Sequence, residues 1–106
     1  EPIDRFRVAE HHARMIHSFT CLDTQALFSS RMVPRFKNIE RVARRKLLQL
    51  QAATELNSLR VPPDNQLEAL KGDRKGQHSI RINDQWRICF VWHTDGAYQV
   101  EIVDYH

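Results

Sequence analysis

Between residues 34 and 56, apolar side chains recur every three or four positions, which is the spacing of one face of an α-helix. They form a narrow stripe consisting of Phe36, Ile39, Ala43, Leu47 and Leu50. Pro34 suits the first turn of this helix, because its fixed φ is helical and its missing N–H is not needed there. The pattern predicts an amphipathic helix over about 34–56. A brief helix, capped by Asp23 or Thr24 and ending near Ser29, is expected before it.

Most of the chain after residue 60 has the pattern of β-structure, because short apolar–polar alternations are separated by turn residues. The turns fall at 61–65, 71–76, 83–84 and 94–96, and the strands at 66–70, 77–82, 86–93 and 97–105. Alternation groups the core-facing residues as Trp86, Ile88, Phe90 and Trp92 on one strand, and Tyr98, Val100 and Ile102 on the next. Together with a short strand expected at 15–21, the pattern predicts an antiparallel meander packed against the helices, an α+β fold.

The length and composition fit one globular domain, expected over residues 15–106, with 1–14 as a leader or an extension outside the core. The chain has 106 residues, of which 42% are hydrophobic and 27% are charged. No apolar run approaches the roughly 20 residues that cross a bilayer, and the N-terminus lacks the apolar stretch of a secretory signal. Cys21 and Cys89 lack the spacing of a CxxC motif, so free thiols in a reducing cytoplasm are expected.

Positive charge is concentrated in the middle of the chain. Residues 31–60 contain eight lysines and arginines against two glutamates, within a net charge of +3 at pH 7 for the whole chain. Four of these cations lie opposite the apolar stripe of the predicted helix: Lys37, Arg41, Arg44 and Arg45. The pattern allows two interpretations, a solvated helix face or a face that binds phosphates or an acidic partner.

The last residues combine groups that are typical of acid–base chemistry. Alternation continues the face of Val100 and Ile102 to Asp104 and His106, where the strand outruns the helices. A carboxylate beside an imidazole raises the pKa of the imidazole and selects its tautomer, as acid–base catalysis requires. The plainer interpretation of the same residues is a polar chain end. No Walker loop, GxGxxG, HExxH or GxSxG motif occurs, and the six histidines lack the spacing of metal ligands.

Two further cations stand near turns. Lys71 precedes Gly72, where an ammonium and backbone N–H groups together suit a phosphate, although surface turns often contain lysine. Alternation directs Arg87 away from the tryptophan face of its strand, so the pattern does not place it beside His106 without a twist or a bulge.

Three motifs in the same order resemble the HigB toxins, which belong to the RelE-like superfamily of type II toxin–antitoxin systems. They are LEALKGDRKG at 67–76, SIRINDQWRICF at 79–90 and VEIVDYH at 100–106, and the resemblance covers 15–106. It implies the small RelE-like fold, with two N-terminal helices packed on an antiparallel sheet. It also implies a cytoplasmic toxin that arrests growth by cleaving messenger RNA in the ribosomal A site, without metal or cofactor.

The partners that this resemblance implies are the ribosome, messenger RNA and a helix-turn-helix HigA-type antitoxin. The antitoxin represses the shared operon, so operator DNA is reached only through it, and no membrane is involved. The positions that match the family's active site are Lys71, Arg87, Asp104, Tyr105 and His106. Glu68 stands where some relatives have histidine, and is the candidate for an accessory role.

The implied chemistry uses the 2′-OH of RNA as its nucleophile, so the protein supplies proton transfer and positive charge. His106, oriented by Asp104, is the leading acid–base candidate, and which group is acid and which is base stays open. Lys71 and Arg87 hold the phosphate, and Tyr105 stacks on a base or positions the backbone. The four cations of the predicted helix are the candidates for holding ribosomal RNA.

Two other functions remain open at this point. ParE-like toxins share the scaffold but inhibit gyrase, and a non-catalytic module that binds RNA or an antitoxin would need only the basic helix. The combination of Lys71, Arg87 and the terminal Asp-Tyr-His favours the nuclease.

Overall fold

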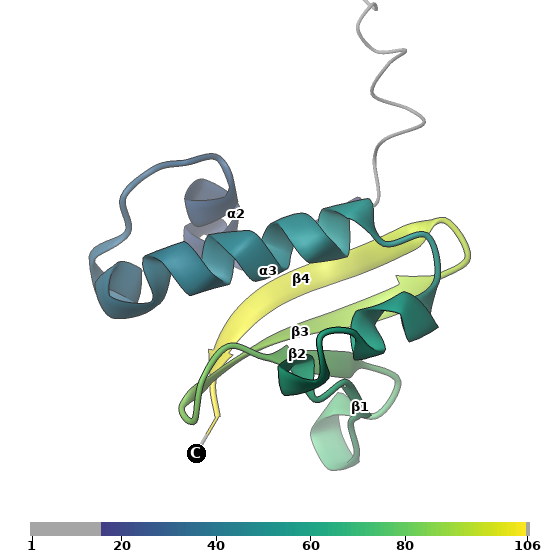
Figure 1. Ribbon diagram of the computed structural model, residues 1–106. Helices are drawn as coiled ribbons and strands as arrows, with labels where there is room; N and C mark the ends of the chain where they lie inside the picture. Colours follow the sequence, from purple (N-terminus) through teal and green to yellow (C-terminus); the bar gives the residue numbers. More distant parts are fainter. Residues whose placement is uncertain (1–15, 106) are drawn as a thin grey trace, which may run out of the picture.

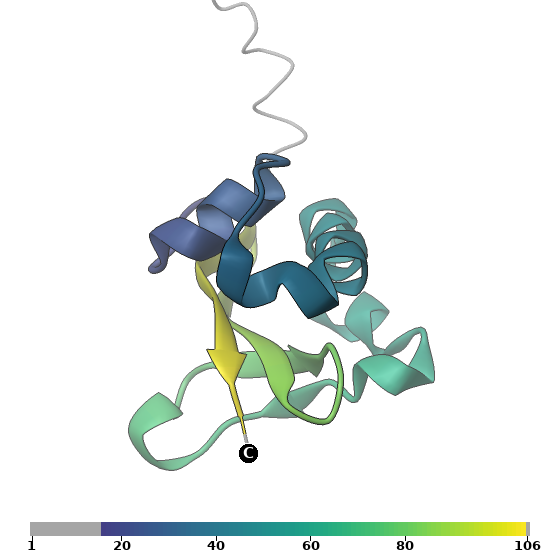
Figure 2. The same ribbon diagram turned by 90° about the vertical axis from the view of Figure 1, so that its left-hand side faces the viewer.

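The computed structural model describes residues 16–105, so the expectations for residues 1–14 and for His106 lie outside the described residues. Two α-helices, α2 (Leu22–Phe28) and α3 (Glu40–Ala52), lie over one face of a four-stranded antiparallel sheet (Figures 1 and 2). The strands, in their order across the sheet, are β1 (Glu68–Ala69), β2 (His78–Arg81), β3 (Trp86–His93) and β4 (Gly96–Asp104). The predicted α+β class and the antiparallel meander are confirmed. No helix within residues 16–105 is long and apolar enough to cross a membrane.

The long predicted helix is divided at Ile39. Its first part is a 3₁₀ helix, η1 (Pro34–Ile39), with Pro34 in the predicted first turn, and only the second part, α3, is α-helical. α3 ends at Ala52 rather than at Leu56, because Ala53 adopts an extended backbone with ψ 128° and buries its side chain. The predicted apolar stripe is correct, since each of its five residues is at most 5% exposed.

The core lies between this stripe and the sheet. Ile88 and Phe90 of β3 are fully buried in it, and the Phe36 ring of η1 meets Trp86 edge-on, with 5.5 Å between ring centroids. The alternation of β3 is therefore as predicted. It leaves Arg87 on the other side of the sheet, which is turned away from α2 and α3 and is called the open face below.

The start of α2 differs from the prediction. The residue that precedes the helix is Cys21, with an extended backbone, so neither Asp23 nor Thr24 is the cap. Thr24 is instead fully buried, and its Oγ1 accepts a hydrogen bond of 3.0 Å from the N–H of Ile102. This contact attaches α2 to the outer edge of β4 and satisfies a buried backbone donor there.

β4 contains a β-bulge, because two of its residues, Gln99 and Val100, stand opposite the single residue Phe90 of β3. Gln99 has a left-handed backbone with φ +56°, although it is not a glycine. The bulge reverses the alternation, so Val100 faces the helices together with Ala97, whereas Tyr98 lies on the open face. The predicted grouping of Tyr98 with Val100 and Ile102 is therefore wrong.

The predicted strand at 15–21 is reduced to two isolated parallel bridges with β4, Ile16 to Ala97 and Phe19 to Val100. Between them, the Ser18 Oγ accepts a hydrogen bond of 2.9 Å from the N–H of Gln99. The segment thus covers the outer edge of β4 and supports the bulge. Because the bulge interrupts the regular spacing of that edge, the pairing does not extend into a strand.

The segment between α3 and β2 contains three 3₁₀ helices: η2 (Leu56–Arg60), η3 (Pro63–Asn65) and η4 (Gly72–Arg74). The last two lie in the predicted turns at 61–65 and 71–76. β1 is shorter than the predicted strand at 66–70, because Gln66 has a left-handed backbone with φ +45° that is incompatible with pairing.

Replacing Thr24 by valine should destabilise the protein, because the similar shape of valine fills the space but leaves the buried N–H of Ile102 without an acceptor. We expect a loss of about 1–3 kcal/mol in the free energy of unfolding, measured by urea denaturation. Thr24→Ser is the matched control, since it keeps the hydroxyl and should cost less than Thr24→Val. Equal losses in the two variants would contradict this role of the hydroxyl.

Candidate active site

The open face holds a buried guanidinium, that of Arg87, which is only 8% exposed. Its Nε donates to the Ser79 Oγ at 2.7 Å, and its Nη2 donates to the carbonyl oxygens of Gln66 at 2.6 Å and Ser79 at 3.4 Å. The Glu68 carboxylate lies farther away, with Oε1 3.8 Å from Nη2. The charge is thus held mainly by neutral dipoles, which fix its position without cancelling it.

The end of β4 brings Tyr105 over this guanidinium. Because Trp86 pairs with Asp104, the end of β4 lies beside the turn between β2 and β3 (Figure 1). There the Tyr105 N–H donates to the Gln85 carbonyl. The Tyr105 ring, 40% exposed, has its centroid 5.9 Å from the Arg87 Cζ. The distance is that of a cation–π contact, and an exposed ring face remains available for stacking.

Asp104 lies on the opposite side of the strand from Tyr105, as its pairing with Trp86 requires. It is exposed at the rim of the sheet, and its Oδ2 accepts a hydrogen bond of 3.1 Å from the Gln85 Nε2. The predicted position, at the end of the core face and beyond the helices, is confirmed. His106, its predicted partner, lies outside the described residues.

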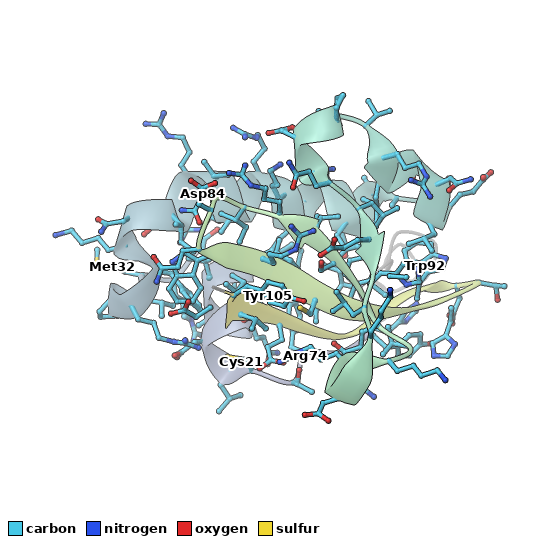
Figure 3. The ribbon with its side chains drawn as sticks, turned by 90° about the horizontal axis from the view of Figure 1, so that it is seen from below. Cys21, Met32, Arg74, Asp84, Trp92 and Tyr105 are labelled. Carbon is cyan, nitrogen blue, oxygen red and sulfur yellow. The ribbon has the colours of Figure 1, made fainter. Side chains whose placement is uncertain are left out.

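A surface pocket of about 480 Å³ adjoins this end of the sheet, lined by Arg74, Val103, Asp104 and Tyr105. Arg74 comes from η4, and its Nη1 is 3.0 Å from the Gln77 Oε1 and 3.5 Å from the Glu101 Oε1. Figure 3 looks onto the open face and labels both Arg74 and Tyr105. Arg74 was not among the predicted site residues. In the sequence, Arg74 is marked only as one of the cations of the turn at 71–76. The pattern does not indicate which of these cations points toward the sheet.

Glu68 lies in β1, and Lys71 lies two residues beyond the end of that strand, where the turn at 71–76 begins. Glu68 pairs with Ser79 and so stands beside Arg87. Lys71 is exposed, directly precedes η4, and makes no side-chain hydrogen bond or ion pair with any residue in the range 16–105. The structure therefore gathers Glu68, Arg87 and Tyr105, and leaves Lys71 at the far end of β1, free to approach a ligand.

Cys89 is a buried residue of β3 on the open-face side of the sheet. It is fully buried between Ser79 on one side and Glu101 on the other. Burial raises the pKa of the Cys89 thiol, partly offset by the positive charges of Arg74 and Arg87. The thiol is therefore neutral near pH 7 and is not a nucleophile there.

The predicted basic face, formed by Lys37, Arg41, Arg44 and Arg45, lies on the outer side of η1 and α3 around a shallow hollow of about 640 Å³. Arg44 differs from the others, because its donors are already used. Nε and Nη2 donate to the carbonyls of Leu27 at 2.9 Å and Arg31 at 2.8 Å, and Nη1 donates to Glu40 at 2.6 Å. Arg44 thus secures the loop after α2, and the remaining three side chains are exposed.

The open face has the groups needed to hold a phosphodiester. Two guanidinium groups, those of Arg74 and Arg87, stand near the exposed Tyr105 ring, and the Glu68 carboxylate lies beside Arg87. Asp104, at the rim of the sheet, lines the same pocket as Arg74 and Tyr105. Within residues 16–105, no three histidine, cysteine, aspartate or glutamate side chains gather in a way that would hold a metal ion.

Comparisons with known proteins identify the family of the chain. Residues 29–106 match the family described as "RelE-like toxin of type II toxin-antitoxin system HigB". The chain is 42% identical over 76 residues to Toxin HigB-1 of Vibrio cholerae serotype O1, which covers 72% of this chain and 77% of that protein. It is 35% identical over 95 residues to Endoribonuclease HigB of Proteus vulgaris, which covers 87% of this chain and 100% of that protein. The chain therefore belongs to the HigB family of RelE-like toxins of type II toxin–antitoxin systems.

Proposed function

We propose that this toxin is a ribosome-dependent endoribonuclease that cleaves messenger RNA in the A site, using the 2′-OH of the RNA as nucleophile. The observation that carries the proposal is the buried Arg87 guanidinium, held on the open face by Ser79 and Gln66. The name of the Proteus vulgaris relative, Endoribonuclease HigB, supports the same activity. Membership of a type II toxin family implies an antitoxin partner. We propose that it is of the helix-turn-helix HigA type and that the toxin acts in the cytoplasm.

The reaction needs one proton removed and one proton supplied. The 2′ oxygen loses its proton and forms a bond to phosphorus, and the bond from phosphorus to the 5′ oxygen breaks as that oxygen is protonated. The products carry a 2′,3′-cyclic phosphate and a 5′-OH. Negative charge grows on the non-bridging oxygens in between. We assign Arg87 to stabilise it, because its ion pair with Glu68 is long, 3.8 Å between Nη2 and Oε1, and leaves much of its charge uncompensated.

Proton transfer is assigned to His106, oriented by Asp104, with Glu68 as the accessory group. Glu68 is the carboxylate beside Arg87, 3.8 Å from its Nη2, so it stands next to the proposed phosphate position. Lys71 and Arg74 approach the phosphates of the RNA from the turn at 71–76, and Tyr105 offers its exposed ring to a base.

Binding to the ribosome is assigned to the exposed cations of the basic face, Lys37, Arg41 and Arg45. They lie on the outer side of η1 and α3, whereas the open face is on the far side of the sheet from these helices (Figure 2). A contact with ribosomal RNA through α3 therefore leaves the open face accessible to messenger RNA. We leave Arg44 out of this assignment, because its guanidinium already donates to the loop after α2.

Replacing Arg87 by glutamine should lower the rate of A-site cleavage by about 10²–10³-fold, because it removes charge that stabilises the transition state. Glutamine keeps an N–H donor for the buried partners, so ribosome binding and the fold should be retained. The measurement is cleavage of messenger RNA on programmed ribosomes. The control is Lys75→Gln, which removes an exposed cation from the turn at 71–76.

A second variant for the same assay is His106→Ala, which removes the imidazole assigned to proton transfer and should also abolish cleavage. Wild-type rates in both Arg87→Gln and His106→Ala would eliminate the nuclease. In that case, loss of DNA supercoiling before any loss of messenger RNA in induced cells would indicate the gyrase inhibitor.

Replacing the 2′-OH at the scissile nucleotide by hydrogen should abolish cleavage while leaving the toxin bound to the ribosome. The reason is that the proposed nucleophile belongs to the RNA. Product analysis of the unmodified RNA should find a 5′-OH on the downstream fragment. A 5′-phosphate, or cleavage of the 2′-deoxy substrate, would instead indicate attack by water.

Charge reversal at Arg41 and Arg45 should weaken ribosome binding, with an effect that grows as salt is lowered, because exposed phosphate contacts release counterions. Ribosome affinity measured at two salt concentrations tests this, and thermal unfolding checks that the fold is intact. Unchanged affinity at low salt would return the basic face to a merely solvated surface.

A further inference from the structure

We propose that Lys46, a buried lysine of α3, is a positioning residue that holds the Arg87 guanidinium in place through Asn65 and the carbonyl of Gln66. This inference rests on the proposed function only for its kinetic consequence, because the positioning itself is a property of the fold. The two side chains belong to different elements, with α3 on one side of the sheet and Arg87 on the other.

Lys46 is 1% exposed, which is rare for lysine unless the ammonium is paired. Its Nζ donates to the Asn65 Oδ1 at 2.6 Å and lies 3.4 Å from the Asp64 Oδ2. Burial lowers the pKa of Lys46, and the Asp64 carboxylate opposes this effect. An apolar side chain would occupy the same place without the cost of removing a charge from water, so the ammonium calls for an explanation beyond packing.

Asn65 uses both ends of its amide. Its Oδ1 accepts from Lys46, and its Nδ2 donates to the Leu59 carbonyl and to the Gln49 Oε1, each at 3.1 Å. The fully buried side chain thus closes the loop from η2 to η3 and attaches it to α3 at two points, Lys46 and Gln49. A residue held in this way has little freedom to turn.

Gln66 follows directly and has a left-handed backbone, with φ +45° and ψ 57°. This conformation is unusual for a residue other than glycine and persists where the surroundings hold it. It directs the Gln66 carbonyl to the Arg87 Nη2, 2.6 Å away. On its other side, the guanidinium is held by Ser79 of β2. Arg87 therefore has two anchors, one within the sheet and one that reaches back to α3 through Asn65 and Lys46.

Loss of the Lys46 ammonium should loosen the second anchor and leave the first. The guanidinium would then move relative to the phosphate, and small displacements of a catalytic group lower the rate by up to about 100-fold. We expect kcat to fall about 10- to 100-fold, while KM changes little, because Lys71, Arg74 and the ring of Tyr105 do not depend on Lys46.

The test compares Lys46→Met, which keeps the length of the side chain, with Arg60→Met, which removes the same charge from an exposed side chain of η2. The first measurement is the NMR signal of the Arg87 Nε–H, which donates to Ser79 and is buried. It should shift and exchange faster with solvent in Lys46→Met and stay unchanged in Arg60→Met. This measurement does not require catalytic activity.

The second measurement is kcat and KM for A-site cleavage, repeated in an Arg87→Gln background. If Lys46 acts through Arg87, then Lys46→Met lowers kcat in the wild-type background and has no further effect in Arg87→Gln. Equal losses in both backgrounds would show a merely structural role and overturn the proposal. So would an unchanged Arg87 signal in a folded Lys46→Met protein.

Asn65→Asp is the second variant, for use if Lys46→Met does not fold. It keeps an acceptor for the ammonium but removes the donor to Leu59 and Gln49, and it should shift the Arg87 signal in the same way. Failure of the proposed function is distinguishable, because it would appear as wild-type protein that does not cleave RNA. Failure of this inference appears as an Arg87 signal that stays unchanged in folded Lys46→Met, or in Asn65→Asp where Lys46→Met does not fold.

Discussion

The charge of Arg87 is permanent, and the sheet has to accommodate it on a face that neither α2 nor α3 covers. Removing a guanidinium from water costs several kcal/mol unless fixed partners replace the solvent. Those partners come from three separate parts of the chain: the Ser79 hydroxyl of β2, the Gln66 carbonyl before β1 and the Tyr105 ring after β4. The position of each element around the open face is tied to this one group, and its fixed orientation is what suits it to charge that develops in a transition state.

Local patterns predicted the parts of this arrangement that depend on periodicity. The alternation of β3 correctly directs Arg87 away from Trp86 and Ile88, and the apolar stripe correctly identifies the buried face of η1 and α3. The motifs from residue 67 onward identified the family. Periodicity works at these places because one face of each element is buried and the other is not.

The remaining features depend on contacts between distant residues. The partners of Lys46 lie 18 and 19 residues away, and the hydroxyl that supports Ile102 lies 78 residues away. Arg44 belongs to the basic face by its position in the helix, but its donors bind two carbonyls of another segment. Gln66 and Gln99 have left-handed backbones without being glycines, so nothing in their residue type indicates a turn or a bulge. In each case the tertiary structure, rather than a local preference, determines the conformation.

The bulge at Gln99 has a consequence for how chains of this family can differ in length. Side chains alternate with a period of two along a strand. Whether the number of residues between the bulge and Tyr105 is odd or even therefore decides which side chains reach the open face. Adding or deleting one residue between Val100 and Tyr105 would exchange the two faces and turn Tyr105 away from Arg87. On the other side of the bulge, toward the β3–β4 turn, β4 contributes none of the site residues described above. A shift of register there would leave the open-face site unchanged. Insertions and deletions should therefore be tolerated at the tip of the β3–β4 hairpin, but not in the five residues that end at Tyr105.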